Sequence, residues 1–96
     1  MDLELEDKVI IVTGASRGLG SSISKYLIDE GAYVVAAARS EEDLNSLQKY
    51  NDERILPVRC DLSIKKEVEE LVSVACGRFG NLHGIVNNAG IAPAEN

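Results

Sequence analysis

Four short apolar runs alternate with amphipathic stretches along this chain, and the alternation predicts the order of its elements. The runs are rich in β-branched residues or alanine, which is typical of strands buried on both faces. They cover residues 8–13, 33–38, 55–60 and 84–87. Between them, apolar residues recur at helical spacing, at Leu19, Ile23, Tyr26 and Leu27, at Leu44 and Leu47, and at Ile64, Val68, Leu71, Val72, Ala75 and Phe79. Strands and helices therefore alternate, as in an α/β protein with a parallel sheet.

Local signals mark the ends of the helices. Gly31 and Gly80 follow the first and third helical stretches, where a helix commonly ends in left-handed backbone. Ser40 can cap the second helix, and Glu41 and Glu42 then lie near the positive end of its dipole.

The handedness of strand connections predicts the strand order. Crossovers between parallel strands are right-handed, so a second and third strand that step outward from the first place their helices on one face. Pro57, which lacks an N–H, suits an edge position for the third strand. The fourth strand then lies on the free side of the first, and its helix covers the opposite face. The predicted order is 3-2-1-4, with a crevice at the carboxyl ends of strands one and four.

Composition excludes several classes of function. The 96 residues suffice for one small domain, and 45% hydrophobic with 27% charged residues is ordinary for a soluble globular protein. The net charge of −6 disfavours nucleic acid and acidic membranes as partners, and no apolar run is long enough to span a membrane. Cys60 and Cys76 form no disulfide framework, and the acidic N-terminus lacks the features of a secretory signal. We therefore expect a cytoplasmic protein.

The segment after the first strand carries the strongest chemical signal, Thr13-Gly14-Ala15-Ser16-Arg17-Gly18-Leu19-Gly20. Its glycines are spaced four and then two residues apart, which differs from the common G-x-G-x-x-G fingerprint, but the physical logic is shared. Gly14 permits a sharp turn, Gly18 lets the backbone approach a pyrophosphate, and Gly20 lets the helix pack close to the sheet. The helix N-terminus then offers N–H groups to phosphates. We predict that residues 14–20 bind a dinucleotide.

A second motif, Asn87-Asn88-Ala89-Gly90, follows the fourth strand. Together the two motifs closely resemble those of the short-chain dehydrogenase/reductase family, and the resemblance covers the whole chain. It implies a doubly wound Rossmann-type fold, a nicotinamide cofactor, and hydride transfer between an alcohol and a carbonyl. It also implies that Asn88, Ala89 and Gly90 flank the adenosine and its ribose. Independently, an Asn amide at a strand end can bond the backbone of the neighbouring strand.

The end of the second strand, Ala38-Arg39-Ser40, bears on the choice of cofactor. Sites for NAD often place an acid here to bind the ribose, but this strand ends without one. Arg39 can bind a 2′-phosphate through two N–H groups, Ser40 can add a hydroxyl, and Arg17 is a second cation. We therefore predict NADP(H) as the preferred cofactor. In the alternative, one of the two acids that follow Ser40 binds the ribose of NAD(H).

Asp61 and Leu62 follow the third strand. The resemblance implies that Asp61 accepts a hydrogen bond from the adenine amine while Leu62 packs on the ring. In the alternative, Asp61 only helps Ser63 to cap the next helix. His83, the only histidine, precedes the fourth strand at the opposite end of the sheet, and we expect it to be structural.

The catalytic residues implied by the resemblance are a Ser, a Tyr-x-x-x-Lys pair and a further Asn, all expected downstream of the fourth strand. None of Tyr26, Tyr33 and Tyr50 is followed by a lysine four residues later. We therefore expect residues 1–96 to form a single, partial NAD(P)-binding domain that ends after the fourth strand and lacks catalytic and metal-binding residues. The full-length oxidoreductase is expected to be a homo-oligomer that acts on a small alcohol or carbonyl. The alternatives are a non-catalytic nucleotide-binding module and a truncated product without function.

Overall fold

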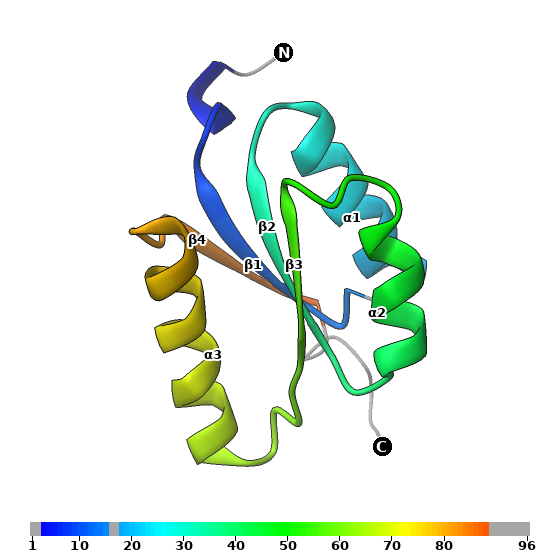
Figure 1. Cartoon of the computed structure of the whole chain (residues 1–96), viewed down its shortest axis with the longest axis vertical. Coiled ribbons are helices and arrows are strands. Elements are labelled where there is room, and N and C mark those ends of the chain that lie inside the picture. The colour runs from blue at the N-terminus through cyan, green and yellow to red at the C-terminus, as the bar shows by residue number, and fades with distance from the viewer. Residues whose placement is uncertain (1–2, 16–17, 89–96) are drawn as a thin grey trace.

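A parallel sheet of four strands forms the centre of the computed structural model, which describes residues 3–15 and 18–88 (Figure 1). The strand order is β3-β2-β1-β4, as predicted. Along the chain the elements are η1 (Leu3–Leu5), β1 (Val9–Thr13), α1 (Gly18–Asp29), β2 (Tyr33–Ala38), α2 (Glu41–Gln48), β3 (Ile55–Arg59), α3 (Lys65–Phe79) and β4 (Gly84–Asn87).

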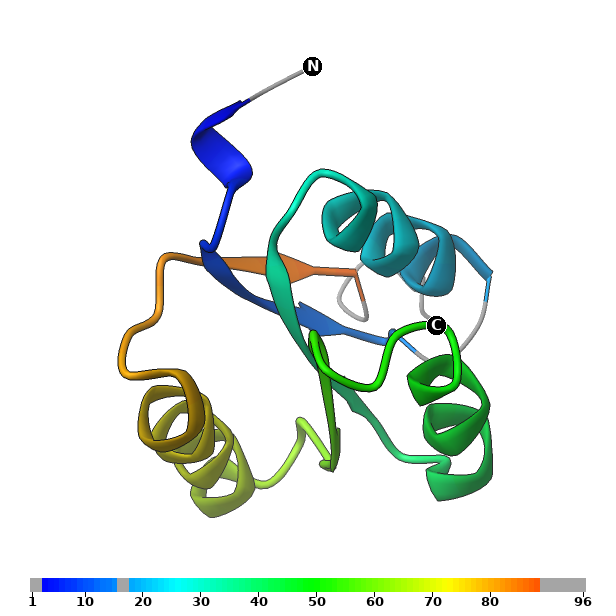
Figure 2. The ribbon, with the colours of Figure 1, turned by 45° about the horizontal axis from the view of Figure 1, so that its top comes forward.

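The helices cover both faces of the sheet. Helices α1 and α2 lie on one face and α3 lies on the other (Figures 1 and 2). Successive strand residues point to opposite faces, so Ile10 and Val12 of β1 join the core beneath α1 and α2, while Val9 and Ile11 join the core beneath α3. All five residues of β1 are buried. This explains why the strand is apolar up to its last residue, Thr13, and the arrangement of the helices confirms the predicted doubly wound architecture.

Both edges of the sheet follow from the strand order. Strand β3 pairs only with β2 among the described residues, and its Pro57 lies opposite Ala36. The proline therefore occupies an edge strand, as predicted. Strand β4 forms the other edge and pairs with β1 from Gly84 opposite Ile10 to Asn87 opposite Thr13.

The buried face of α1 differs from the predicted stripe. Leu27 is buried, but Leu19 and Tyr26 are 60% and 57% exposed. The face that meets the sheet instead includes Gly20 and Ser24, and the hydroxyl of Ser24 donates to the carbonyl of Gly20 at 2.9 Å. Small residues let the helix approach the sheet closely, while Leu19 and Tyr26 lie toward solvent.

The strand and helix boundaries differ slightly from the prediction. Strand β1 begins at Val9, one residue later than predicted, and β3 ends at Arg59, one residue earlier. Ile64 is the N-cap residue of α3 and is 43% exposed, so it lies outside the buried stripe of that helix. Gly80 ends α3 in left-handed backbone with a φ of 85°, as predicted.

Candidate functional site

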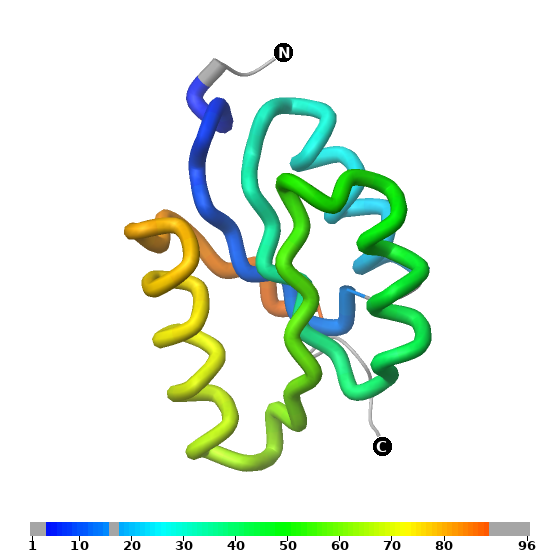
Figure 3. Tube along the Cα trace, in the orientation of Figure 1, coloured from blue at the N-terminus to red at the C-terminus, as the bar shows by residue number. Residues whose placement is uncertain are grey.

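The predicted binding segments meet at one end of the sheet. The four strands run in the same direction, and the trace in Figure 3 shows their carboxyl ends at the same side of the molecule. Thr13 lies opposite both Ala37 and Asn87, and Ala38 lies opposite Arg59. The segments that leave these residues therefore start from one crevice.

The turn after β1 is held against β2. Gly14 has a φ of 62°, which is left-handed backbone that favours glycine. The backbone N–H of Ala15 donates to the carbonyl of Ala37 at 3.2 Å, and its side chain is completely buried in the core. Ala15 thus anchors the turn, and its N–H is already used within the protein.

A three-way contact joins this turn to α1 and to the end of β4. The side-chain amide of Asn88 donates from Nδ2 to the carbonyl of Gly14 at 3.2 Å. A Cβ placed on Gly20 would collide with that same carbonyl and would lie 2.9 Å from Asn88 Nδ2. Glycine is therefore required at position 20, because the first turn of α1 and both motifs pack against one another there.

Gly18, at the start of α1, opens toward free space. Its φ is 61°, and a Cβ added to it would meet no described atom within 4 Å. A backbone without a side chain at the N-terminus of a helix is the arrangement that lets phosphate oxygens reach backbone N–H groups. The geometry therefore fits a phosphate-bearing ligand. Leu19 beside it is exposed, and the predicted residues Ser16, Arg17, Ala89 and Gly90 lie outside the described residues.

The end of β2 presents an exposed arginine. Arg39 is exposed, and Ser40 caps α2 by accepting the backbone N–H of Asp43 at 3.2 Å. The carbonyl of Ala38 accepts the N–H of Cys60 at 2.9 Å, which ties the end of β2 to that of β3. The hydroxyl hydrogen of Ser40 remains able to donate to a ligand.

The loop after β3 fixes the carboxylate of Asp61. Its Oδ1 accepts the backbone N–H and the hydroxyl of Ser63, at 3.0 and 2.7 Å. These two bonds lower the pKa of Asp61, and the charges of Arg39 and Arg59 lower it further, while partial burial opposes the shift. Arg39 and Asp61 are thus neighbours at the crevice.

Sequence reasoning missed Glu67. Its Oε1 accepts the backbone N–H of Asp61 at 2.8 Å, so it takes part in the same loop. A glutamate in the first turn of a helix is a known signal for a side chain that reaches back to the preceding loop, and this could have identified it. Ser63 contributes to the loop through its two bonds to Asp61, but it does not cap α3. The N-cap of that helix is Ile64, which makes no side-chain cap bond.

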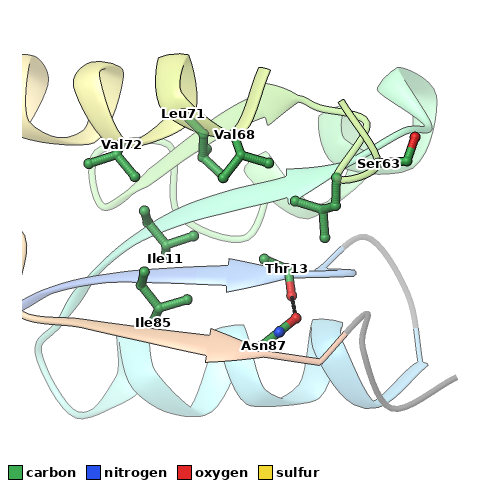
Figure 4. A pocket seen from close by; sticks show the side chains of 9 residues that line it. Ile11, Thr13, Ser63, Val68, Leu71, Val72, Ile85 and Asn87 are labelled. Atoms are coloured by element: carbon green, nitrogen blue, oxygen red, sulfur yellow. Dashed lines mark hydrogen bonds between the residues drawn. The ribbon is translucent and has the colours of Figure 1, made fainter. Parts of the chain in front are cut away.

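A cleft of about 550 Å³ lies beside the crevice, on the α3 side of β1 and β4 (Figure 4). Thr13 and Asn87 face one another at one end of it, and the Thr13 hydroxyl donates to Asn87 Oδ1 at 3.0 Å. Its other walls are mostly apolar and are formed by Ile11, Leu62, Ser63, Val68, Leu71, Val72 and Ile85.

His83 lies at the amino end of the sheet, as predicted. Its ring Nδ1 accepts the backbone N–H of Val9 at 2.9 Å, and the backbone N–H of His83 donates to the carbonyl of Val9 at 2.8 Å. The residue extends the pairing of β1 with β4 at the end away from the crevice.

Within residues 3–15 and 18–88, none of the helices combines the length and apolar character needed to cross a membrane. Within the same ranges, no group of three or more His, Cys, Asp or Glu residues is arranged to hold a metal ion.

Several known proteins similar to this chain are named as oxidoreductases or dehydrogenases. An uncharacterized oxidoreductase of Staphylococcus aureus (strain USA300) is 41% identical over 87 residues, which are 90% of this chain and 38% of the relative. The L-fucose dehydrogenase of Oryctolagus cuniculus is 38% identical over 86 residues, which are 90% of this chain and 30% of that enzyme. The chain therefore spans well under half the length of these relatives.

Solved structures share the fold. A 3-ketoacyl-(acyl-carrier-protein) reductase from Brucella melitensis, in complex with NADH, superposes with a TM-score of 0.80 at 30% identity over 84% of this chain and 33% of that one. A variant actinorhodin polyketide ketoreductase with NADPH superposes with a TM-score of 0.81 at 35% identity over 85% of this chain and 33% of that one.

The sequence model of the short chain dehydrogenase family matches residues 8–96, which are nearly the whole chain. The match includes both glycine-containing motifs and all four strands of the sheet. With the strand order and the likeness to solved reductases, it assigns the chain to the short chain dehydrogenase family of oxidoreductases.

Proposed function

We propose that this chain is the NADP(H)-binding portion of an oxidoreductase, formed as one domain over residues 1–96. When bound, the nicotinamide cofactor supplies or accepts the hydride that is exchanged with an alcohol or carbonyl substrate. The chain itself contributes the binding of the dinucleotide, through residues 14–20, 38–40, 61–62 and 88–90. We further propose that the protein acts in the cytoplasm and that the full-length oxidoreductase is a homo-oligomer.

The observation that carries the proposal is the contact between the turn after β1 and the end of β4. Asn88 holds the carbonyl of Gly14, and this fixes the turn while Gly18 stays open at the N-terminus of α1. A rigid turn costs little entropy when a ligand binds to it. The reductases solved with NADH and with NADPH share this fold, which supports a nicotinamide dinucleotide as the ligand.

The preference for NADP(H) rests on the end of β2. Arg39 is exposed there, and no acid occupies the tip of the strand. Glu41 and Glu42, the acids that would serve NAD(H), are in the first turn of α2, where they already interact favourably with the helix dipole. A fork of guanidinium N–H groups matches the geometry of a phosphate.

The proposal is tested by calorimetric titration of NADPH and NADH into the chain and into Gly18→Ala. The new methyl meets no described atom within 4 Å, but it strains the left-handed backbone of Gly18 and occupies the approach to the backbone N–H groups. We expect the affinity for NADPH to fall at least about tenfold. Gly80→Ala is the matched control, because Gly80 also has left-handed backbone, a Cβ on it also meets nothing within 4 Å, and it lies at the end of α3. Failure of the starting chain to bind either cofactor contradicts the proposal.

A further inference from the structure

Two side chains hold the loop between β3 and α3 around Asp61. Glu67 accepts the backbone N–H of Asp61, and Ser63 donates twice to one oxygen of the Asp61 carboxylate, Oδ1. Within the described part of the chain, the second oxygen, Oδ2, makes no hydrogen bond. The loop therefore fixes both the backbone and the carboxylate of Asp61 and leaves one acceptor available.

The role of Glu67 differs from that of an ordinary helix cap. In a capping box, a glutamate at the third helical position bonds the N–H of the N-cap residue. Here the N-cap is Ile64, and its N–H already donates to the carbonyl of Asp61 at 3.0 Å. Glu67 instead bonds Asp61 itself, and it thereby secures the residue that leaves β3.

The charge of Asp61 suits it to accept a hydrogen bond. The bonds from Ser63, helped by the charges of Arg39 and Arg59, hold its pKa below the usual value, so the group is ionised at neutral pH. An ionised carboxylate only accepts hydrogen bonds. It therefore favours a purine with an exocyclic amine, as in adenine, over one with a carbonyl at that position, as in hypoxanthine.

We infer that Glu67 is a positioning residue, which holds Asp61 so that its free carboxylate oxygen meets the amine of a bound adenine and rejects a purine carbonyl. The inference rests on the dinucleotide site proposed above. It assigns a specificity role to a residue of α3 that acts only through Asp61, whereas Ser63 orients the carboxylate itself.

The test compares NADPH with its hypoxanthine analogue by calorimetric titration into the chain. We expect the starting chain to prefer NADPH by about tenfold or more, since its adenine amine donates a hydrogen bond to the charged carboxylate and the hypoxanthine carbonyl cannot. In Glu67→Ala this ratio should fall severalfold, because Asp61 is no longer held in place. In Glu67→Gln it should be largely retained, because the side-chain amide oxygen can still accept the Asp61 N–H.

Glu70→Ala is the control, since it removes the same charge from an exposed position of α3. A purely structural role for Glu67 would weaken both ligands equally and leave the ratio unchanged, and that result overturns the inference while the dinucleotide site stands. Equal affinities in the starting chain also overturn it, and binding of neither ligand overturns the proposed function as well. If circular dichroism shows Glu67→Ala to be unfolded, Glu67→Asp replaces it, because the shorter acid keeps the charge but loses the reach.

Discussion

Arg39 lies exposed at the end of β2, and its charge contributes to the lowered pKa of Asp61 beside it. If it binds the 2′-phosphate, one such charged hydrogen bond contributes about 1.5–3 kcal/mol. NADPH should therefore bind about ten- to a hundredfold more tightly than NADH, with the exposed acids of α2 reducing the gain. In Arg39→Asp we expect this preference to collapse or reverse when both cofactors are titrated by calorimetry.

Arg78→Asp is the matched control for Arg39, because it makes the same change of charge in the last turn of α3. It should alter stability and leave the ratio of the two affinities unchanged. Equal affinities in the starting chain, or a ratio that does not move in Arg39→Asp, would show that Arg39 is only a surface residue.

The contact between Ser63 and Asp61 makes the stability of the fold depend on pH. Because the hydrogen bonds from Ser63 lower the pKa of Asp61 in the folded state, the pair stabilises the fold at pH values above the ordinary aspartate pKa of about 3.9. That stabilisation is lost as the pH falls below this value and through the folded pKa. We expect Ser63→Ala to raise the pKa of Asp61 in a titration followed by NMR of its carboxyl carbon. An unchanged pKa in the variant would exclude Ser63 as the main cause.

Arg54 connects several elements at the amino end of the sheet. Its Nη1 donates to the carbonyl of Gly31 at 2.7 Å and lies 3.4 Å from Asp7 Oδ1, and its guanidinium lies 4.5 Å from the centre of the Tyr33 ring. Arg54→Ala removes a charged hydrogen bond and a cation–π contact, so we expect a loss of about 1–3 kcal/mol in the free energy of unfolding. Urea denaturation followed by circular dichroism measures it.

Asp7→Asn separates the ion pair from the other contacts of Arg54. Asp7 has a φ of 61°, which asparagine also tolerates, so this variant removes the charge without straining the backbone. Exposed ion pairs contribute only about 0–1 kcal/mol, and Asp7→Asn should therefore cost less than Arg54→Ala. Equal losses in the two variants would mean that the ion pair, and not the bond to Gly31, joins these elements.

The edge of the sheet formed by β4 bears on the stability and self-association of the whole molecule. Strand β4 has one neighbour among the described strands, Ile85 is 56% exposed, and the apolar cleft lies beside it. Unpaired strand edges and apolar surface favour pairing between chains. We expect the chain to be marginally stable or to self-associate with concentration in sedimentation velocity, and Ile85→Lys to shift it toward monomer.

Val74→Lys is the control for this surface, since Val74 is 41% exposed on α3 and does not line the cleft. It should leave the association unchanged. A monodisperse monomer with a sharp, reversible thermal transition would contradict the prediction for the starting chain.

The chain alone should also show no dehydrogenase or reductase turnover. General acid–base catalysis needs a proton donor near the carbonyl oxygen, and no tyrosine of the 96 residues begins a Tyr-x-x-x-Lys pair. Spectroscopy of reduced nicotinamide with the purified chain and a panel of alcohols measures this. Alcohol-dependent formation of NADPH that a single substitution in this chain abolishes would disprove it.

The architecture of this protein and the end of the sheet where its candidate site lies follow from the pattern of residue types along the chain. Strands buried on both faces are mostly apolar, as β1 is from Val9 to Val12, and right-handed crossovers together with Pro57 favour the observed strand order. The glycines at positions 14, 18 and 20 predict the turn, because left-handed backbone at Gly14 and Gly18 favours glycine and Gly20 has no space for a Cβ. These are local or topological constraints, so they can be recognised in the amino-acid sequence.

The side chains that complete the site depend instead on how the elements pack in three dimensions. The sequence predicted the close packing of Gly20, but it could not show that Ser24 joins the buried face of α1 while Leu19 is turned to solvent, since helical spacing allowed either face. It could not show that Glu67 accepts the backbone N–H of Asp61, or that the Asn88 amide donates to the carbonyl of Gly14 in particular. Each of these depends on differences of a few tenths of an ångström in the distances between side chains and backbone groups. Such distances are set by how the helices settle on the sheet, which the pattern of residue types along the chain does not specify.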